Sequence, residues 1–119
     1  MSAVSSEVHV TYEDQQKINR FARLNARSDE IKDELKMKEK LLSNIDEALQ
    51  EMDVLGLESD DAKVHLMEGE VFVAFDLSDG QEWIESRKEK VNEECRILND
   101  QLDKIKREMN DLKIALYSK

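Results

Sequence analysis

Two stretches of this chain carry apolar residues at alternating steps of three and four positions. The first runs from Phe21 to Met52 and the second from Ile84 to Leu116. Eight of ten positions are apolar in the first series, and nine of ten in the second. A spacing near 3.5 residues is the heptad pattern of helices that bury a narrow stripe against another helix. The pattern therefore predicts two long helices that pack along their length.

The two series match without a slip when they are paired in opposite directions. Met52 then faces Ile84, and the residue numbers in every pair add to 136 or 137. We therefore expect a mostly α fold, a long antiparallel two-helix coiled-coil hairpin with ten core layers. Away from the free ends of the helices, the predicted seam consists of Ile31, Leu35, Leu42, Ile45, Leu49, Met52, Ile84, Val91, Cys95, Leu98, Leu102, Ile105 and Met109.

Three polar residues interrupt this seam: Ser28, Lys38 and Lys88. A seam lysine either extends past its partner to water or fixes the register of the two helices. The alternative is a weak layer at which the helix pair flexes, and the sequence leaves both interpretations open. Cys95 is the single cysteine, so an internal disulfide is excluded. We interpret it as a small apolar core residue rather than a reactive thiol.

Composition supports long helices and limits the classes of partner. The chain has no proline and three glycines, and its net charge is −10. Residues 53–80 carry one basic and eight acidic side chains, and the two helical stretches are nearly neutral. Nucleic acid and anionic membrane are therefore poor partner predictions. With no secretory signal and no run near the ~20 apolar residues of a membrane span, we expect a cytoplasmic protein, and leave a nuclear pool open.

The segment between the helices predicts a β-hairpin. Two runs rich in β-branched and aromatic residues, within 64–75, flank a short turn that contains Gly69. The second run is apolar on both faces, and one hairpin can neither cover it nor pair its own backbone edges. We therefore expect strands from other subunits to complete the sheet. The predicted assembly residues are Val64, Leu66, Val71, Phe72, Val73 and Phe75.

These elements define one domain over residues 11–119, preceded by a flexible tail over residues 1–10. The first helix is expected over about 12–52, with Thr11 as its N-cap and Gly56 beyond its end. The second is expected over about 79–117, started by a capping box at Ser78. No nucleophile with a base, no zinc-ligand spacing and no phosphate-binding glycine loop is present. We therefore predict neither enzymatic activity nor a cofactor or metal.

Antiparallel pairing brings the start of the first helix and the end of the second to the same tip. Apolar residues concentrate in these two segments. They are Tyr12, Ile18, Phe21, Leu24, Leu112, Ile114, Leu116 and Tyr117. Taken one at a time, each of these residues could simply cover the end of the coiled coil. Together they offer apolar surface that could hold another apolar chain.

The order helix, β-hairpin, helix, with apolar tips, resembles a β-type subunit of prefoldin. The resemblance is carried by Tyr12–Ala22, Glu68–Val73 and Asp111–Tyr117, of which the first is specific. It implies a place in a hetero-hexamer of two α-type and four β-type subunits, whose pooled strands form a double β-barrel. It also implies that the arm tips hold unfolded clients, such as actin and tubulin, and pass them to the cytosolic chaperonin without ATP.

Under this resemblance the hairpin residues become assembly residues, and the tip residues become candidates for client contact. The alternative is a structural coiled-coil scaffold or tether whose tip binds a folded partner. A plain tether has no need of an apolar strand pair in the middle of its chain. The hairpin therefore favours the chaperone subunit.

Overall fold

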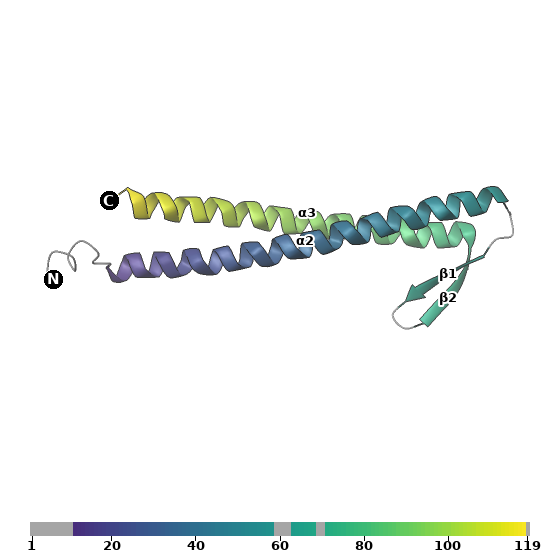
Figure 1. Ribbon diagram of the computed structural model, residues 1–119, viewed down its shortest axis with the longest axis horizontal. Coiled ribbons are helices and arrows are strands. Elements are labelled where there is room, and N and C mark those ends of the chain that lie inside the picture. The colour runs from purple at the N-terminus through teal and green to yellow at the C-terminus, as the bar shows by residue number, and fades with distance from the viewer. Residues whose placement is uncertain (1–10, 59–62, 69–70, 119) are drawn as a thin grey trace. The chain divides into compact units, whose positions relative to one another are not determined.

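The computed structural model describes residues 11–58, 63–68 and 71–118, except for the side chains of Met67, Glu68 and residues 71–73. The elements follow in the order α2 (Tyr12–Glu58), β1 (Lys63–Glu68), β2 (Val71–Asp76) and α3 (Leu77–Tyr117) (Figure 1). The predicted fold class, two long helices joined through a β-hairpin, is confirmed. The predicted tail over residues 1–10 lies outside the described residues.

Helix α2 begins at the predicted cap. The Asp14 backbone N–H donates a hydrogen bond of 3.0 Å to Thr11 Oγ1. The Gln15 N–H donates one of 2.9 Å to the Thr11 carbonyl oxygen. The first bond satisfies an N–H that the first turn of a helix leaves without an internal partner, and the second is the first backbone bond of the helix itself. Glu13 and Asp14 also place negative charge at the positive end of the helix dipole.

The inner ends of both helices differ from the prediction. Helix α2 continues through Gly56 to Glu58, although glycine costs about 1 kcal/mol relative to alanine inside a helix. A Cβ at Gly56 would lie 2.9 Å from Leu77 Cδ2, so the missing side chain leaves room for the first residue of α3. Helix α3 follows β2 directly, which puts Ser78 inside its first turn. The predicted capping box before the helix was therefore wrong.

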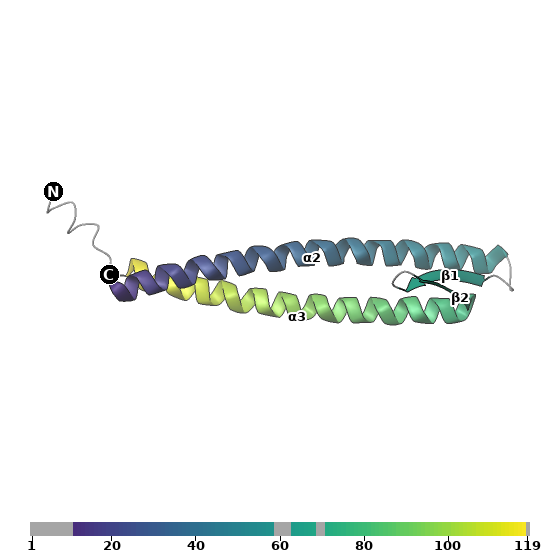
Figure 2. The same ribbon diagram turned by 90° about the horizontal axis from the view of Figure 1, so that it is seen from below.

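The hairpin forms close to its predicted bounds. Strands β1 and β2 are antiparallel, and their register pairs Val64 with Phe75 and His65 with Ala74. Because side chains alternate between the faces of a strand, Val64 and His65 point to opposite sides of the sheet. Figures 1 and 2 together show the hairpin against one side of the adjoining parts of α2 and α3.

The chain divides into two packed units, Met1–Glu34 with Leu98–Lys119, and Leu35–Ile97. The core of Leu35–Ile97 is a cluster of four buried residues, two from each helix. They are Ile45, Met52, Ile84 and Val91. Partly buried side chains surround this cluster: Leu41, Leu42, Leu49, Val64, Leu66, Leu77, Trp83 and Cys95. The core of this unit therefore contains seam residues from both helices and two side chains from the hairpin.

Both seam lysines extend out of the apolar stripe of Leu35–Ile97 and bind a carboxylate on the opposite helix. Lys38 Nζ lies 2.6 Å from Glu94 Oε2, and Lys88 Nζ lies 2.7 Å from Asp46 Oδ1. As the residue number on α2 rises, that of its partner on α3 falls, as antiparallel helices require. Each lysine thus buries part of its stem and keeps its charge paired. This geometry favours the interpretation that the lysines fix the register.

The unit of Met1–Glu34 and Leu98–Lys119 buries the remaining seam. Its buried residues are Leu24, Ser28, Ile31, Leu98 and Leu102, and the exposed fraction of Ile31 is 0%. Arg20 of α2 and Glu108 of α3 form an ion pair of 2.7 Å beside this stripe. With both units counted, every one of the thirteen seam residues is buried or half-buried.

Candidate functional site

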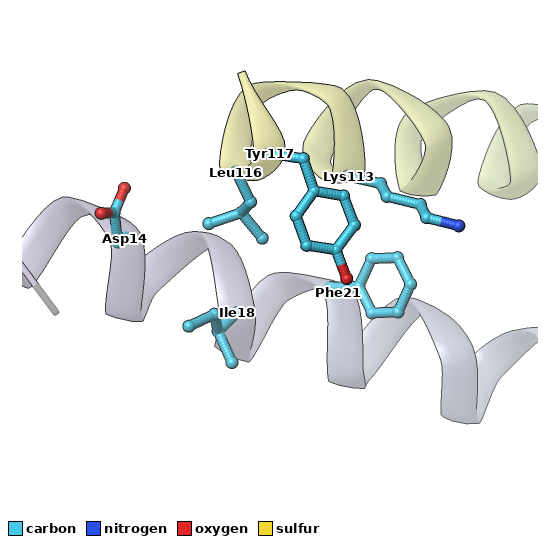
Figure 3. Close-up of a pocket in the computed structure, with 6 residues that line it drawn as sticks. All are labelled: Asp14, Ile18, Phe21, Lys113, Leu116 and Tyr117. Atoms are coloured by element: carbon cyan, nitrogen blue, oxygen red, sulfur yellow. The ribbon is translucent and has the colours of Figure 1, made fainter. Parts of the chain in front are cut away.

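The apolar tip residues surround an open pocket in the unit of Met1–Glu34 and Leu98–Lys119 (Figure 3). Its volume is about 540 Å³. The lining residues are Asp14, Ile18 and Phe21 from α2, and Lys113, Leu116 and Tyr117 from α3. In Figure 3 the Tyr117 ring extends from α3 towards α2, where the Phe21 ring lies. The pocket therefore offers two aromatic and two aliphatic side chains beside one charge of each sign.

The pocket lies where the apolar seam stops. The heptad steps that lead from Leu24 to Phe21 reach Lys17 at the next position towards the N-terminus. A charged residue there cannot extend the apolar stripe, so Phe21 and Leu116 are its last apolar layer. Lys17 is half-buried, consistent with a stem that still follows the helix pair while its ammonium reaches water.

The eight predicted tip residues fall into three groups by exposure. Leu24 is buried and belongs to the seam rather than to the surface. Phe21, Leu112 and Leu116 are half-buried. The exposed group is Tyr12, Ile18, Ile114 and Tyr117, with Tyr117 79% exposed. Only the second and third groups can offer apolar surface to a ligand.

The predicted assembly residues are partly covered by the chain's own helices. Val64 and Leu66 pack against the core cluster of Leu35–Ile97. Phe75 is half-buried, and its ring centroid lies 6.1 Å from that of Trp83 in a tilted arrangement. The Arg87 guanidinium carbon lies 5.7 Å from the centre of the Trp83 ring, within the range of a cation–π contact. The side chains of Val71, Phe72 and Val73 lie outside the described part of the chain.

Gly80 lets the hairpin approach α3 closely, a role that sequence analysis missed. The residue is buried, and a Cβ built there would overlap Val64 Cγ2 and lie 3.5 Å from Phe75 Cβ. Gly80, Trp83 and Arg87 recur at steps of three and four, so they share one face of α3 beside the seam. That spacing is the signal that could have shown a second contact face on this helix.

The other face and the outer edges of the hairpin remain open. His65 and Ala74 are exposed partners on the face away from the core cluster. The sheet has two strands, so within the described residues each strand has one backbone edge without a neighbouring strand. Such an edge is a template for pairing with a further chain.

Several charged residues of the described chain form ion pairs that lower the pKa of a carboxyl group. The ammonium of Lys38 donates a hydrogen bond to Glu94 and lowers the pKa of that carboxyl. Arg96 acts in the same way on Glu93. Within residues 11–58, 63–68 and 71–118 no group of His, Cys, Asp and Glu side chains is arranged to hold a metal ion. No helix of these segments has the length and apolar character needed to cross a membrane.

Comparison with known proteins identifies close sequence relatives. Prefoldin subunit 4 of Homo sapiens and that of Bos taurus are each 37% identical to this chain over 117 residues, which cover 98% of the chain and 86% of either relative. A probable prefoldin subunit 4 of Drosophila melanogaster is 38% identical over 113 residues, covering 95% of this chain and 80% of the relative.

A solved structure and a family profile agree with these relatives. The crystal structure of the prefoldin beta subunit from Thermococcus strain KS-1 superposes with a TM-score of 0.79 at 16% identity, covering 92% of this chain and 94% of that one. At this identity the likeness concerns the fold. The profile of the family described as prefoldin subunit matches residues 15–119. This chain therefore belongs to the prefoldin subunit family.

Proposed function

We propose that the chain is a β-type subunit of a hetero-hexameric prefoldin that binds unfolded polypeptides at its helix tip and delivers them to the cytosolic chaperonin. The proposal rests on the tip pocket, in which Ile18, Phe21 and Tyr117 present apolar surface at the end of the seam. Actin and tubulin are the expected clients, as the resemblance implies. The subunit works in the cytoplasm, needs no ATP and performs no reaction of its own.

Binding at one tip is weak by its nature. Complete burial of a large apolar side chain contributes about 1.5–3 kcal/mol, and an open pocket covers only part of such a side chain. Several arms that engage the same client make the later contacts intramolecular, which can raise the total affinity by about two to four orders of magnitude. A client released from one tip therefore stays bound to the complex, yet a competing chaperonin can still remove it.

Assembly of the hexamer is assigned to the hairpin. The open edges of β1 and β2 offer backbone N–H and C=O groups to strands of sister subunits, the mode of recognition called β-augmentation. Because Val64 and Leu66 pack on the core cluster, the hairpin is held against α2 and α3 before a partner arrives. A preorganised edge loses less conformational entropy on assembly than a disordered segment would.

The test is suppression of aggregation of chemically denatured actin by the assembled complex. We expect the double variant Ile18→Ser with Tyr117→Ser to protect less well than the wild type, since it removes apolar surface from the pocket. Ile97→Ser is the matched control, because Ile97 is 43% exposed and Ile18 is 41% exposed. Equal protection by the pocket variant and the wild type would refute client binding at the tip, and would favour the tether.

A further inference from the structure

The tip differs in charge from the rest of the chain. Residues 12–28 carry four basic and two acidic side chains, and residues 104–118 again carry four and two. Residues 35–97 carry eight basic and seventeen acidic side chains, within a chain of net charge −10. This difference in charge disappears when the charges are summed over each whole helix. The two helix segments that lead to the pocket are therefore each net positive in an acidic protein, and at the pocket itself Lys17 and Lys113 lie among the acidic Glu13, Asp14 and Asp111.

The basic residues at the tip are not all neutralised by the chain. Arg20 is paired with Glu108, and Arg27 lies 3.1 Å from Glu30. Lys113 lines the pocket, is exposed, and has no ion pair among the described residues. Asp14, the other charged lining residue, is half-buried and has an interaction of its own within the chain. Lys113 is therefore the exposed cation that the pocket offers to a ligand, beside the half-buried carboxylate of Asp14.

From this arrangement, and resting on the proposed function, we infer that the tip pocket selects unfolded segments in which a large apolar side chain is flanked by aspartate or glutamate. The apolar side chain occupies the space between Ile18, Phe21 and Leu116, and a neighbouring carboxylate pairs with the Lys113 ammonium. Peptides with basic flanks would meet repulsion from Lys113 and from the positive segments beside it. The pocket would therefore select client segments both by a large apolar side chain and by the charge of the residues that flank it.

The expected preference is modest and depends on salt. One exposed ion pair changes an affinity by about 1.4- to 5-fold. The surrounding basic residues act over a Debye length of about 10 Å at 0.1 M salt, so the preference should shrink as the salt concentration rises. A preference that persisted unchanged at high salt would have to come from shape rather than from charge.

The experiment measures binding of three fluorescent peptides to the assembled complex by anisotropy. The peptides share one Leu-Phe core and differ only in flanking residues, which are Glu, Gln or Lys. We expect the Glu peptide to bind most tightly and the Lys peptide least. Lys113→Glu should weaken binding of the Glu peptide more than that of the Gln peptide. Lys40→Glu, the same change at an exposed lysine of Leu35–Ile97, should not alter the order.

Two results would overturn the inference. One is equal affinity for all three peptides, and the other is an equal response of the Glu peptide to Lys113→Glu and to Lys40→Glu. Either result leaves the proposed function standing as long as the Gln peptide binds and the Ile18 and Tyr117 variants lose protection of denatured actin. A different pair of results would refute the proposed function. In that case no peptide would bind, and the Ile18 and Tyr117 variants would protect denatured actin as well as the wild type does.

Discussion

Replacement of Gly80 by alanine tests the docking of the hairpin on α3. The new methyl group would overlap Val64 Cγ2, and valine has little freedom at χ1 to move aside. Overpacking of this kind costs about 1–3 kcal/mol, while alanine in place of glycine gains about 1 kcal/mol in a helix. We therefore expect Gly80→Ala to lower the free energy of unfolding by about 1 kcal/mol.

The sign should reverse when Val64 is shortened. In a Val64→Ala background the methyl groups that oppose the new Cβ are gone, so Gly80→Ala should raise the free energy of unfolding by about 0.5–1 kcal/mol. The double-mutant cycle would then give a coupling of about 1–3 kcal/mol between the two positions. Gly56→Ala is the matched control, because its nearest neighbour is Leu77 Cδ2, the end of a longer side chain that can rotate. That control should be neutral or stabilising.

Urea unfolding of the full chain, followed by far-UV circular dichroism, measures all four variants. Hydrogen exchange of the β1 amides shows whether the loss is local to the hairpin. If Gly80→Ala stabilises the wild type as much as Gly56→Ala does, or if the cycle gives no coupling, β1 does not pack on α3 as described.

Three further predictions concern the seam, its lysine and the hairpin. Ile31→Ala should lower the free energy of unfolding by about 2–5 kcal/mol in urea denaturation, whereas Met37→Ala, at a 74% exposed position, should change it by less than about 0.5 kcal/mol. Because Lys38 holds the pKa of Glu94 below its usual value of 4.5, the stabilisation is present above that value and is lost as the pH falls through the lower folded pKa. Lys38→Met should therefore raise the Glu94 pKa in an NMR titration, and an unchanged pKa would contradict the ion pair. Trp83 is the single tryptophan and lies beside Phe75, so Phe75→Ala should shift its fluorescence to the red, while Phe21→Ala should leave it unchanged.

The helical part of the fold was predictable because it depends on a repeating local pattern. The heptad spacing holds from Phe21 onwards and does not require knowledge of distant contacts. Glycine was harder to interpret from sequence. Gly56 was placed beyond the end of the first helix, since glycine disfavours helices, yet it lies inside α2. Gly80 was expected within the second helix, but no role was assigned to it. Tertiary contacts explain why glycine occupies these two positions. Leu77 approaches Gly56 closely, and Val64 approaches Gly80 closely.

The two candidate surfaces were predictable in outline and not in detail. Antiparallel pairing alone brings Phe21 and Leu116 together, but only the structure separates buried Leu24 from exposed Tyr117. Alternation along β1 predicts two faces of the hairpin without saying which one the chain covers. The structure shows Val64 and Leu66 on the covered face and His65 on the open one. The positive tip was missed because the charges were summed over entire helices.

The open edges of β1 and β2 carry a consequence for how such subunits diverge. Backbone N–H and C=O groups are the same in nearly every residue. An interface formed by strand addition at such an edge therefore tolerates substitution of many side chains along the strand. For the same reason, backbone pairing alone does not distinguish one subunit from another. Where sister subunits pair through these edges, the choice among them depends on side chains beside the edges, such as the exposed His65, which can change while the backbone pairing stays the same.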